Sequence, residues 1–283
     1  MEVCMLIGIV GAGIMGTDIA HLAIENNYDV ILHDIDESQL KHAYETITGR
    51  LDRYVEEKRL EQSQRGKIIS LLKLHKNIKD LHKADIIIEC IPENLECKKN
   101  VFKSLDAICK AGTILASNTS SLPITSIASA TKRPEYVIGI HFMNPARAMR
   151  LVEIVGGIAT TRETIESAKS FVKSLGKTPV ESKDYPGFVL NRILMPMINE
   201  AIFTLYEGAA SAETIDKTMK LGLNLPMGPL QLADLIGLDV VIAIIEELYE
   251  GFGDPKYRPC PLLKKYVEAG YLGKKTGRGF YSY

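Results

Sequence analysis

One histidine and one glutamate in this sequence are suited to proton transfer. His141 ends a strand-like apolar run, and Glu153 has two aliphatic residues on each side within the next such run. A carboxylate among aliphatic side chains is costly to bury unless a donor or a cation satisfies it. If the two runs form neighbouring strands, Glu153 reaches His141, and an imidazole oriented by a carboxylate can act as a general base. Arg147 and Arg150 are the competing partners for Glu153.

A cluster of hydroxyl groups and one amide follows another strand-like run, residues 113–116. It reads Ser117-Asn118-Thr119-Ser120-Ser121-Leu122 and precedes Pro123. Ligands of parallel sheets bind beyond the carboxyl ends of the strands, which makes this cluster a candidate binding segment. The same residues could instead cap a helix, with the remaining hydroxyl groups in solvent.

A further amide stands at the start of the C-terminal part of the chain. Pro186 suits the first turn of a helix, and Asn191 then lies about one and a half turns into that helix, among apolar neighbours. A buried amide requires a hydrogen-bond partner. That partner is either another protein group or a bound ligand, and the sequence leaves both open.

Three glycines form a candidate nucleotide-binding turn. Gly11, Gly13 and Gly16 follow the first strand-like run and open a helical pattern. In the dinucleotide-binding motif the first glycine permits a tight turn, the second lets a pyrophosphate approach the backbone, and the third lets helix and strand pack closely. Asp34 ends the next strand-like run, where a carboxylate accepts hydrogen bonds from an adenosine ribose. Its charge would repel the 2′-phosphate of NADP, so the sequence favours NAD.

The elements that must position these residues alternate between short β-branched runs and longer amphipathic segments, as in successive βα units of a mainly parallel sheet. The charged segment 38–75 has helical periodicity, and we interpret it as a helical hairpin inserted into the sheet domain. The expected fold is a doubly wound, Rossmann-like α/β domain over residues 1–185. Its predicted strands are 6–10, 30–33, 86–90, 113–116, 137–141 and 151–155.

After residue 185 the β-rich pattern ends, and Gly and Pro separate long helical segments. The sequence predicts an all-α domain over 186–283, with helices at 188–206, 212–221, 228–251 and 261–269. Segments 193–205 and 235–248 are apolar over more than one face. A domain of about a hundred residues has little interior for so many apolar side chains, so we expect a subunit interface between copies of the chain.

Composition narrows the class of protein further. The chain has 283 residues, 46% hydrophobic and 24% charged, and its 34 Lys and Arg against 35 Asp and Glu leave no basic field for a nucleic acid. No apolar run approaches the roughly 20 residues of a membrane span, and no secretory signal is visible. Five cysteines without a C-x-x-C pair, and six histidines without metal-ligand spacing, favour a cytoplasmic protein that uses an organic cofactor and no metal.

In combination, these segments resemble the L-3-hydroxyacyl-CoA dehydrogenase family, most closely its short-chain members in bacterial butyrate metabolism. The resemblance covers essentially the whole chain and rests on GAGIMG, SNTSSL, HFMNP, LVEIV, PGFVLNRIL, NLPMGPLQLADLIGLD and KKTGRGFYSY. It implies reversible hydride transfer between NAD and C3 of a 3-hydroxyacyl-CoA, such as 3-hydroxybutyryl-CoA, which becomes acetoacetyl-CoA. It also implies a homodimer or a higher homo-oligomer, with the dimer formed through the helical domain.

The resemblance further implies roles for individual residues. His141 is the catalytic base held by Glu153, and Ser120 and Asn191 contact the reacting oxygen of the substrate. The NAD site is implied to include five residues besides the three glycines: Asp34, Glu93, Lys98, Asn118 and Asn144.

The helical hairpin of the family places basic residues against the CoA nucleotide, which points to Arg53 and Lys58 in this chain. Glu56 and Glu57 interrupt the basic run, however. Helical pairs such as Arg53 with Glu57 therefore remain the alternative use of this charge.

Two other interpretations stay open at this point. The β-hydroxyacid dehydrogenases share a Rossmann-plus-helical architecture, but they have a lysine four residues before the interdomain asparagine, where this chain has Gly187. A non-catalytic NAD-binding protein of the same fold is the second alternative. Such a protein would be expected to have lost the base or its partner, and this chain retains both.

Overall fold

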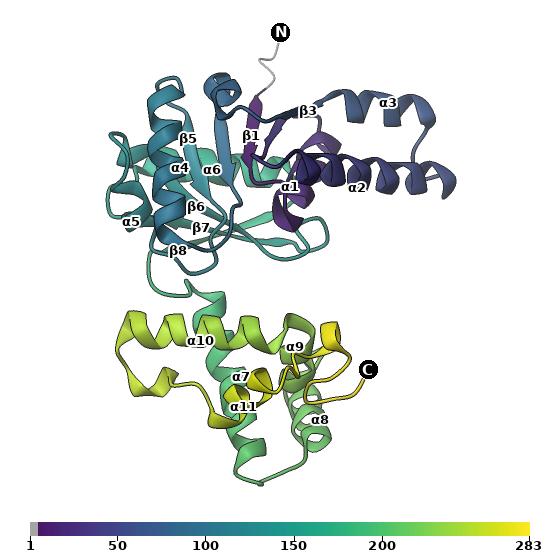
Figure 1. Cartoon of the computed structure of the whole chain (residues 1–283), viewed down its shortest axis with the longest axis vertical. Helices are drawn as coiled ribbons and strands as arrows, with labels where there is room; N and C mark the ends of the chain where they lie inside the picture. The colour runs from purple at the N-terminus through teal and green to yellow at the C-terminus, as the bar shows by residue number, and fades with distance from the viewer. Residues whose placement is uncertain (1–4) are drawn as a thin grey trace. The chain divides into compact units, whose positions relative to one another are not determined.

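The computed structural model describes residues 5–283, which divide into two compact units, the chain up to Asp184 and Tyr185–Tyr283. An eight-stranded sheet with the strand order β3-β2-β1-β4-β5-β6-β7-β8 forms the centre of the first unit (Figure 1). Its strands are β1 (Leu6–Val10), β2 (Asp29–His33), β3 (Leu72–His75), β4 (Ile86–Glu89), β5 (Ile114–Ser117), β6 (Val137–Phe142), β7 (Leu151–Gly156) and β8 (Thr178–Lys183).

All neighbouring strands pair in parallel except β6 and β7, which are antiparallel. The central strands β4 and β5 are buried along their whole length. Strands covered on both faces are expected to be apolar rather than alternating. In β4 and β5 only the last residues, Glu89 and Ser117, are polar. The predicted Rossmann-like α/β fold is therefore confirmed.

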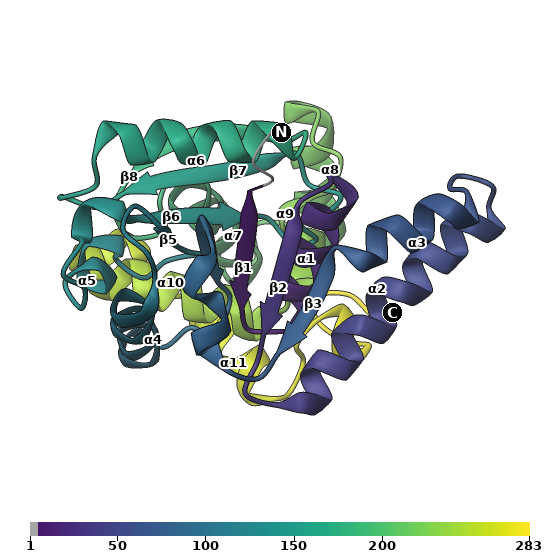
Figure 2. The ribbon, with the colours of Figure 1, turned by 90° about the horizontal axis from the view of Figure 1, so that it is seen from above.

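Helices cover both faces of this sheet (Figure 2). Alternate residues of a strand point to opposite faces, and in β6 Ile138 and Ile140 join the core cluster that α1, α2 and α6 contribute to, whereas Gly139 faces Ile124 of α5. The elements between the strands are α1 (Ile14–Glu25), α2 (Glu37–Glu56), α3 (Gln62–Ser70), α4 (Leu95–Ile108), α5 (Ile124–Ala128) and α6 (Arg162–Ser174), with the 3-10 turns η1 (Ile78–Lys83) and η2 (Pro134–Tyr136).

The expected helical hairpin consists of α2 and α3, which extend beyond the β3 edge of the sheet (Figure 2). The apolar side of α2 packs on the core through residues such as Leu40 and Ile47, while α3 has no buried residue. The prediction of helix up to residue 75 was wrong at its end, because 72–75 form β3 at the sheet edge. The apolar residues there fit either period, and pairing with β2 decides the outcome.

The six predicted strands are present within one or two residues of their expected bounds. The other edge strand, β8, is not predicted from the sequence. Its sequence, Thr178-Pro179-Val180-Glu181-Ser182-Lys183, is mostly exposed and contains a proline, both of which weaken a strand signal and are tolerated at a sheet edge.

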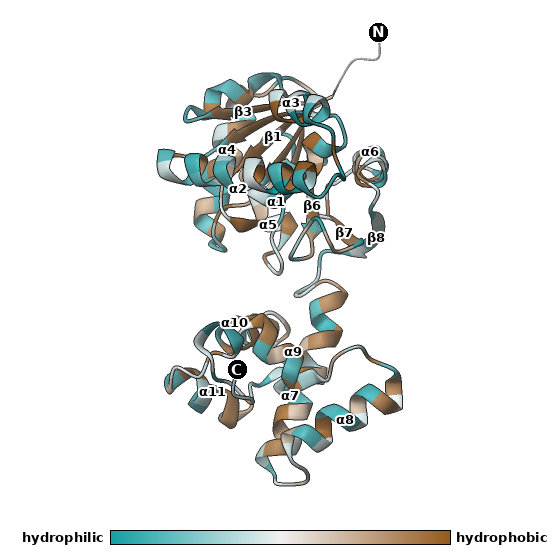
Figure 3. Ribbon diagram, turned by 90° about the vertical axis from the view of Figure 1, so that its right-hand side faces the viewer, coloured by the Kyte–Doolittle hydropathy of each residue, from teal (hydrophilic) through white to brown (hydrophobic). Residues whose placement is uncertain are grey.

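The second unit is helical, with an apolar core of its own. Its elements are α7 (Leu190–Tyr206), α8 (Ala212–Leu223), α9 (Pro229–Ile236), α10 (Leu238–Phe252) and α11 (Pro261–Glu268), with the 3-10 turns η3 (Pro255–Tyr257) and η4 (Lys274–Thr276). Figure 3 shows hydrophilic and hydrophobic residues recurring along α8, as in an amphipathic helix. No helix among residues 5–283 is both long enough and apolar enough to cross a bilayer.

Two helix predictions in this unit were wrong in detail. The segment 228–251 is two helices, because Gly237 between α9 and α10 has a φ of 103°, a conformation that ends α9. Pro186 precedes helix α7 rather than starting it, since Gly187 and Phe188 both have positive φ values. Asn191 consequently lies in the first turn of α7.

Candidate active site

His141 and Glu153 form a hydrogen-bonded pair inside the first unit. They are directly opposite in the antiparallel pairing of β6 with β7, which places their side chains on the same face of the sheet. Nδ1 of His141 donates to Oε2 of Glu153 over 2.9 Å, and both side chains are buried. The carboxylate thereby selects the tautomer and the orientation of the ring.

The two arginines that could have competed for Glu153 lie in the connection between β6 and β7. The guanidinium of Arg147 contacts Glu25 of α1 and the hydroxyl group of Tyr54 on α2. Arg150 is exposed immediately before β7. The pairing that the sequence suggested for Glu153 is therefore present in the structure.

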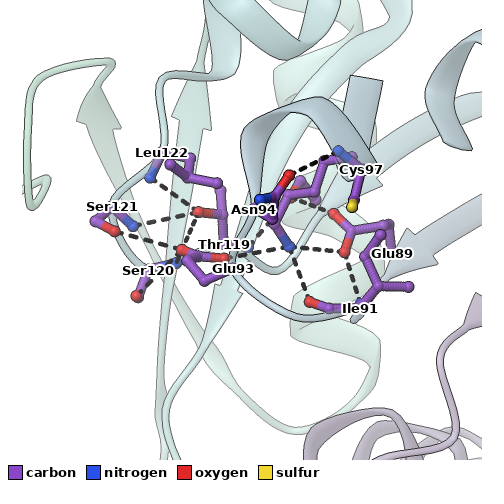
Figure 4. A network of polar contacts seen from close by, with 11 residues as sticks. Glu89, Ile91, Glu93, Asn94, Cys97, Thr119, Ser120, Ser121 and Leu122 are labelled. Atoms are coloured by element: carbon purple, nitrogen blue, oxygen red, sulfur yellow. Dashed lines mark hydrogen bonds and ion pairs between the residues drawn. The ribbon is translucent and has the colours of Figure 1, made fainter. Parts of the chain in front are cut away.

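The hydroxyl-rich segment 117–122 folds around the carboxylate of Glu93 (Figure 4). Oε1 of Glu93 accepts hydrogen bonds from the hydroxyl group of Thr119 and from the backbone amide of Ser120, the latter over 2.9 Å. The hydroxyl groups of Ser120 and Ser121 lie 3.4 and 3.3 Å from the same oxygen. One carboxylate thus sets the shape of the loop that carries Ser120.

Capping explains only part of this cluster. The hydroxyl oxygen of Thr119 accepts from the backbone amide of Leu122 over 2.9 Å and so closes the turn. The first amides of α5, those of Ile124 and Thr125, bond instead to the carboxylate of Asp184 at 2.9 and 2.7 Å. Ser120 takes no part in either cap.

A buried ion-pair network supports Glu93. Nζ of Lys98 lies 2.7 Å from Glu89 and 3.2 Å from Glu93, and the side chains of Lys98 and Glu89 are almost completely buried. Burial raises the pKa of Glu89 above its usual value. Burial also opposes the charge on Glu93, but Lys98 and the bonds from Thr119 and Ser120 outweigh it and hold the pKa of Glu93 below its usual value.

The glycine turn between β1 and α1 has the form that a dinucleotide requires. Gly11 has a φ of 103°, and a Cβ on Gly16 would lie 1.8 Å from the carbonyl oxygen of Gly11, so neither position accepts a side chain. A Cβ on Gly13 would meet no protein atom within 4 Å. The backbone at Gly13, at the N-terminus of α1, is therefore open to a pyrophosphate.

Asp34 is fixed beside this turn. Its carboxylate accepts from the backbone amides of Ala12 at 2.7 Å and Asp36 at 2.9 Å. Both bonds orient the side chain at the carboxyl end of β2, next to the turn where the adenosine half of a dinucleotide is expected. The residues present fit NAD.

The two asparagines of the expected cofactor site lie at the ends of β5 and β6. The side-chain oxygen of Asn118 accepts from the amide of Phe142 over 2.9 Å, which joins the ends of the two strands. Asn144 is exposed in the connection that follows β6. Both residues are therefore at the carboxyl edge of the parallel strands, as are Asp34 and Glu93.

Three predicted site residues, Asn191, Arg53 and Lys58, belong to the second unit or to the helical hairpin and not to the strand ends. Asn191 is buried within the second unit. Arg53 and Lys58 are exposed at the far end of the helical hairpin and form no ion pair with another residue in 5–283. The suggested pair of Arg53 with Glu57 is absent there, because Glu57 pairs with Arg59 at 3.2 Å.

Glu89, which bonds to Lys98, Ile91 and Ser117 within the network, is not among the predicted site residues. Its position gave one signal. Glu89 follows three isoleucines at the end of a predicted strand, where a carboxylate is costly without a partner, just as at Glu153. Its partner Lys98 lies on another element, α4, and periodicity does not indicate that contact.

A dinucleotide turn, a buried carboxylate–histidine pair and a hydroxyl loop at one sheet edge define an NAD-dependent dehydrogenase with a separate helical domain. Comparison with known protein families agrees. The NAD binding domain of 3-hydroxyacyl-CoA dehydrogenase matches residues 6–185, and the C-terminal domain of the same enzyme matches 187–283. The chain belongs to the 3-hydroxyacyl-CoA dehydrogenase family, and its cofactor is NAD.

Individual relatives support this assignment. The chain is 51% identical to a 3-hydroxybutyryl-CoA dehydrogenase of Bradyrhizobium diazoefficiens, over 98% of this chain and 94% of the relative. It is 50% identical to a probable 3-hydroxybutyryl-CoA dehydrogenase of Bacillus subtilis, over 97% and 96%. The crystal structure of (S)-3-hydroxybutyryl-CoA dehydrogenase from Ralstonia eutropha is similar with a TM-score of 0.95, 45% identity and 98% coverage of both chains.

Proposed function

We propose that the protein catalyses the reversible, NAD-dependent oxidation of (S)-3-hydroxybutyryl-CoA, and of similar short-chain (S)-3-hydroxyacyl-CoA thioesters, to acetoacetyl-CoA and its analogues. The observation that carries this proposal is the pairing of His141 with Glu153 at 2.9 Å, in a chain of this family. The relatives named above supply the substrate class.

His141 is the proton carrier in this reaction. In oxidation, Nε2 removes the proton from the 3-hydroxyl group while Nδ1 remains bonded to Glu153. NAD held at the turn of Gly11, Gly13 and Gly16 would supply the acceptor for the hydride from C3. In reduction, the imidazolium returns the proton to the oxygen of the 3-keto group, and the buried carboxylate of Glu153 stabilises its charge.

Ser120 and Asn191 are proposed to donate hydrogen bonds to the reacting oxygen as it gains negative charge. One such donor typically contributes roughly a hundredfold to a thousandfold in rate. Glu93 supports the role of Ser120, because it holds the backbone amide of that residue at 2.9 Å. Asn191 lies in the first turn of α7, at the beginning of the helical unit.

The NAD site is proposed to consist of the glycine turn and the side chains at the carboxyl edge of the sheet. Gly11, Gly13 and Gly16 shape the pyrophosphate turn, and Asp34 receives the ribose. Glu93, Lys98, Asn118 and Asn144 complete the site, of which Lys98 is supported as a holder of Glu93.

The CoA nucleotide is proposed to lie against Arg53 and Lys58 on the helical hairpin. Both side chains are exposed, and neither charge is used in an ion pair within residues 5–283. Their charge is therefore available to phosphate groups.

A homodimer formed through the second unit is part of this proposal, but fewer apolar residues are available for the interface than the sequence predicts. Most of the apolar residues first assigned to an interface, such as Ile198 and Ile245, pack in the core of the unit itself. Ile193, Leu235 and Val240 are 67%, 53% and 41% exposed, and they support an interface on α7, α9 and α10. A monomer in light scattering at micromolar concentration would contradict it.

We also place the enzyme in the cytoplasm. The described cysteines, which are Cys90, Cys97, Cys109 and Cys260, are all free thiols, in keeping with a reducing compartment.

The test compares three substrates with NAD, with the formation of NADH followed by absorbance. We expect oxidation of (S)-3-hydroxybutyryl-CoA, and little or none of its (R)-enantiomer or of free (S)-3-hydroxybutyrate. Equal rates with the free acid would indicate a hydroxyacid dehydrogenase instead. No oxidation of the (S)-thioester would overturn the proposal.

A further inference from the structure

Glu89 is a completely buried carboxylate of the network in Figure 4, and it has no role in the proposed proton and hydride transfer. Its Oε1 atom accepts from Nζ of Lys98 and from the amide of Ile91, both over 2.7 Å. Its Oε2 atom accepts from the hydroxyl group of Ser117, also over 2.7 Å. Its backbone carbonyl accepts from the amide of Asn118 over 2.8 Å. Glu89 therefore contacts both the buried lysine and the start of the loop 117–122, which carries Ser120.

Two routes lead from Glu89 to the loop that carries Ser120. The first runs through Lys98, which bridges to Glu93 at 3.2 Å, and Glu93 holds the amide of Ser120. The second runs through Ser117, whose hydroxyl oxygen accepts from the amide of Thr119 at 3.2 Å.

The charge of Glu89 matters to the first route because the side chain of Lys98 is 1% exposed. A buried ammonium group requires compensation, and here two carboxylates share one cation. With Glu89 present, Lys98 is held between the two acids and Glu93 keeps its bonds to the loop. Without the charge on Glu89, Lys98 has Glu93 as its remaining anionic partner, which draws Glu93 toward Lys98 and away from Ser120.

We propose that Glu89 is a positioning residue for Ser120, acting through Lys98 and Glu93 and through Ser117. The inference rests on the proposed function in one respect, since it takes Ser120 to contact the reacting oxygen. Glu89 itself touches neither substrate nor cofactor in this account. Its carboxylate fixes the geometry of a loop whose donor must be placed closely to stabilise the transition state.

The experiment is a double-mutant cycle with Glu89→Gln and Ser120→Ala, with kcat for acetoacetyl-CoA reduction measured at saturating NADH. Gln has the size of Glu but lacks its charge. We expect Glu89→Gln to lower kcat by about tenfold to a hundredfold in the native background. In the Ser120→Ala background the same change should cost less than about threefold, because the group it positions is gone. Equal costs in both backgrounds would overturn the inference.

NADH affinity is measured in the same variants, because Glu93 and Lys98 also belong to the proposed cofactor site. If Glu89→Gln weakens NADH binding and leaves kcat unchanged at saturation, its role is in cofactor binding and the inference is wrong.

Asp106→Asn is the matched control, because it removes a different ion pair from α4, the helix that carries Lys98. Asp106 lies on α4 and pairs with Arg133 at 2.6 Å, well outside the network of Glu89. We expect this variant to lose stability and to retain kcat. A similar fall in kcat for Asp106→Asn would show that weakening α4 is enough, and would overturn the inference.

A second measurement requires no substrate and so separates this inference from the proposed function. Hydrogen exchange of the amides in 118–122 should accelerate in Glu89→Gln relative to the native chain, while exchange in α6 stays the same. Unchanged exchange in 118–122 would contradict the inference even if the wild type were inactive. If Glu89→Gln does not fold, Ser117→Ala removes one of the two routes, and it should show the same pattern at about threefold to tenfold in kcat.

Discussion

Nδ1 of His141 and Oε2 of Glu153 lie 2.9 Å apart because β6 and β7 are antiparallel with these two residues in register. The carboxylate is buried, so little water competes for its bonds. A single register thus binds one nitrogen of His141 to an anion and leaves the other for the proposed proton transfer with the substrate. The consequences of removing that anion can be measured.

Glu153→Gln should lower kcat for acetoacetyl-CoA reduction by roughly a hundredfold, because the amide cannot stabilise the imidazolium charge. Affinity for NADH should remain within about twofold. Glu181→Gln on the neighbouring strand β8 is the control, since Glu181 is an exposed carboxylate paired with Arg162 and Lys169. Steady-state kinetics of both variants provide the check, and equal effects of the two substitutions would remove the special role of Glu153.

Asp34→Asn should reduce the preference for NADH over NADPH, expressed as the ratio of kcat/KM values, by about tenfold or more. The substitution removes the charge that repels a 2′-phosphate, and the amide oxygen can still accept from Ala12. If the wild type used both cofactors equally, or the variant kept the native ratio, Asp34 would not be the selectivity residue.

Arg53→Ala combined with Lys58→Ala should raise KM for acetoacetyl-CoA and make it less sensitive to ionic strength, with kcat retained. Screening by salt weakens exposed charge interactions, so the native enzyme loses more affinity in high salt than the variant does. Arg65→Ala is the control on the same hairpin, because Arg65 already pairs with Asp52 at 2.9 Å. A native KM for the double variant at low and high salt would leave these residues as surface charge.

His21 should make the protein less stable in acid. The side chain is completely buried on α1, and burial, with Arg147 and Arg50 nearby, lowers the pKa of His21 to about 3. The unfolded chain protonates this histidine near its usual pKa of 6.5, so the unfolded state binds the proton first and stability falls as the pH drops from about 6.5 toward 3. The loss is on the order of 2 kcal/mol at pH 5.

Chemical denaturation at several pH values, from about 4 to about 7, measures how the free energy of unfolding changes across this range. The free energy of unfolding of His21→Gln should fall less steeply with acid than that of the wild type. His82→Gln, at an exposed histidine, should leave the slope unchanged. Parallel slopes for the wild type and His21→Gln would contradict the assignment.

The sequence predicts those parts of the site whose residues lie on strands that are consecutive in the chain and adjacent in the sheet. His141 and Glu153 belong to consecutive strands joined by a short connection, so their proximity required only that the strands be neighbours. The glycine turn and Asp34 belong to one βαβ unit, in which β1 and β2 are likewise consecutive and paired.

Contacts between strand ends and helices were less accessible. Lys98 reaches Glu89 from α4, and the contact depends on the rotation of that helix about its axis, which a hydrophobic pattern fixes only approximately. The sequence also allowed residues 117–122 to cap a helix. Asp184 caps α5 instead, and a contact between residues so far apart in the chain leaves no local pattern. The strand β3 was not predicted, because its four residues are too few to distinguish the periodicity of a strand from that of a helix.

The rate of NADH oxidation by acetoacetyl-CoA, measured side by side for the wild type and His141→Gln, is the most direct test of the whole account. If His141 is the proton carrier, the wild type turns over steadily and the variant has a rate lower by a factor of about 10² to 10⁴, with NADH affinity nearly unchanged. Absence of turnover in the wild type, or near-native turnover in His141→Gln, would contradict it.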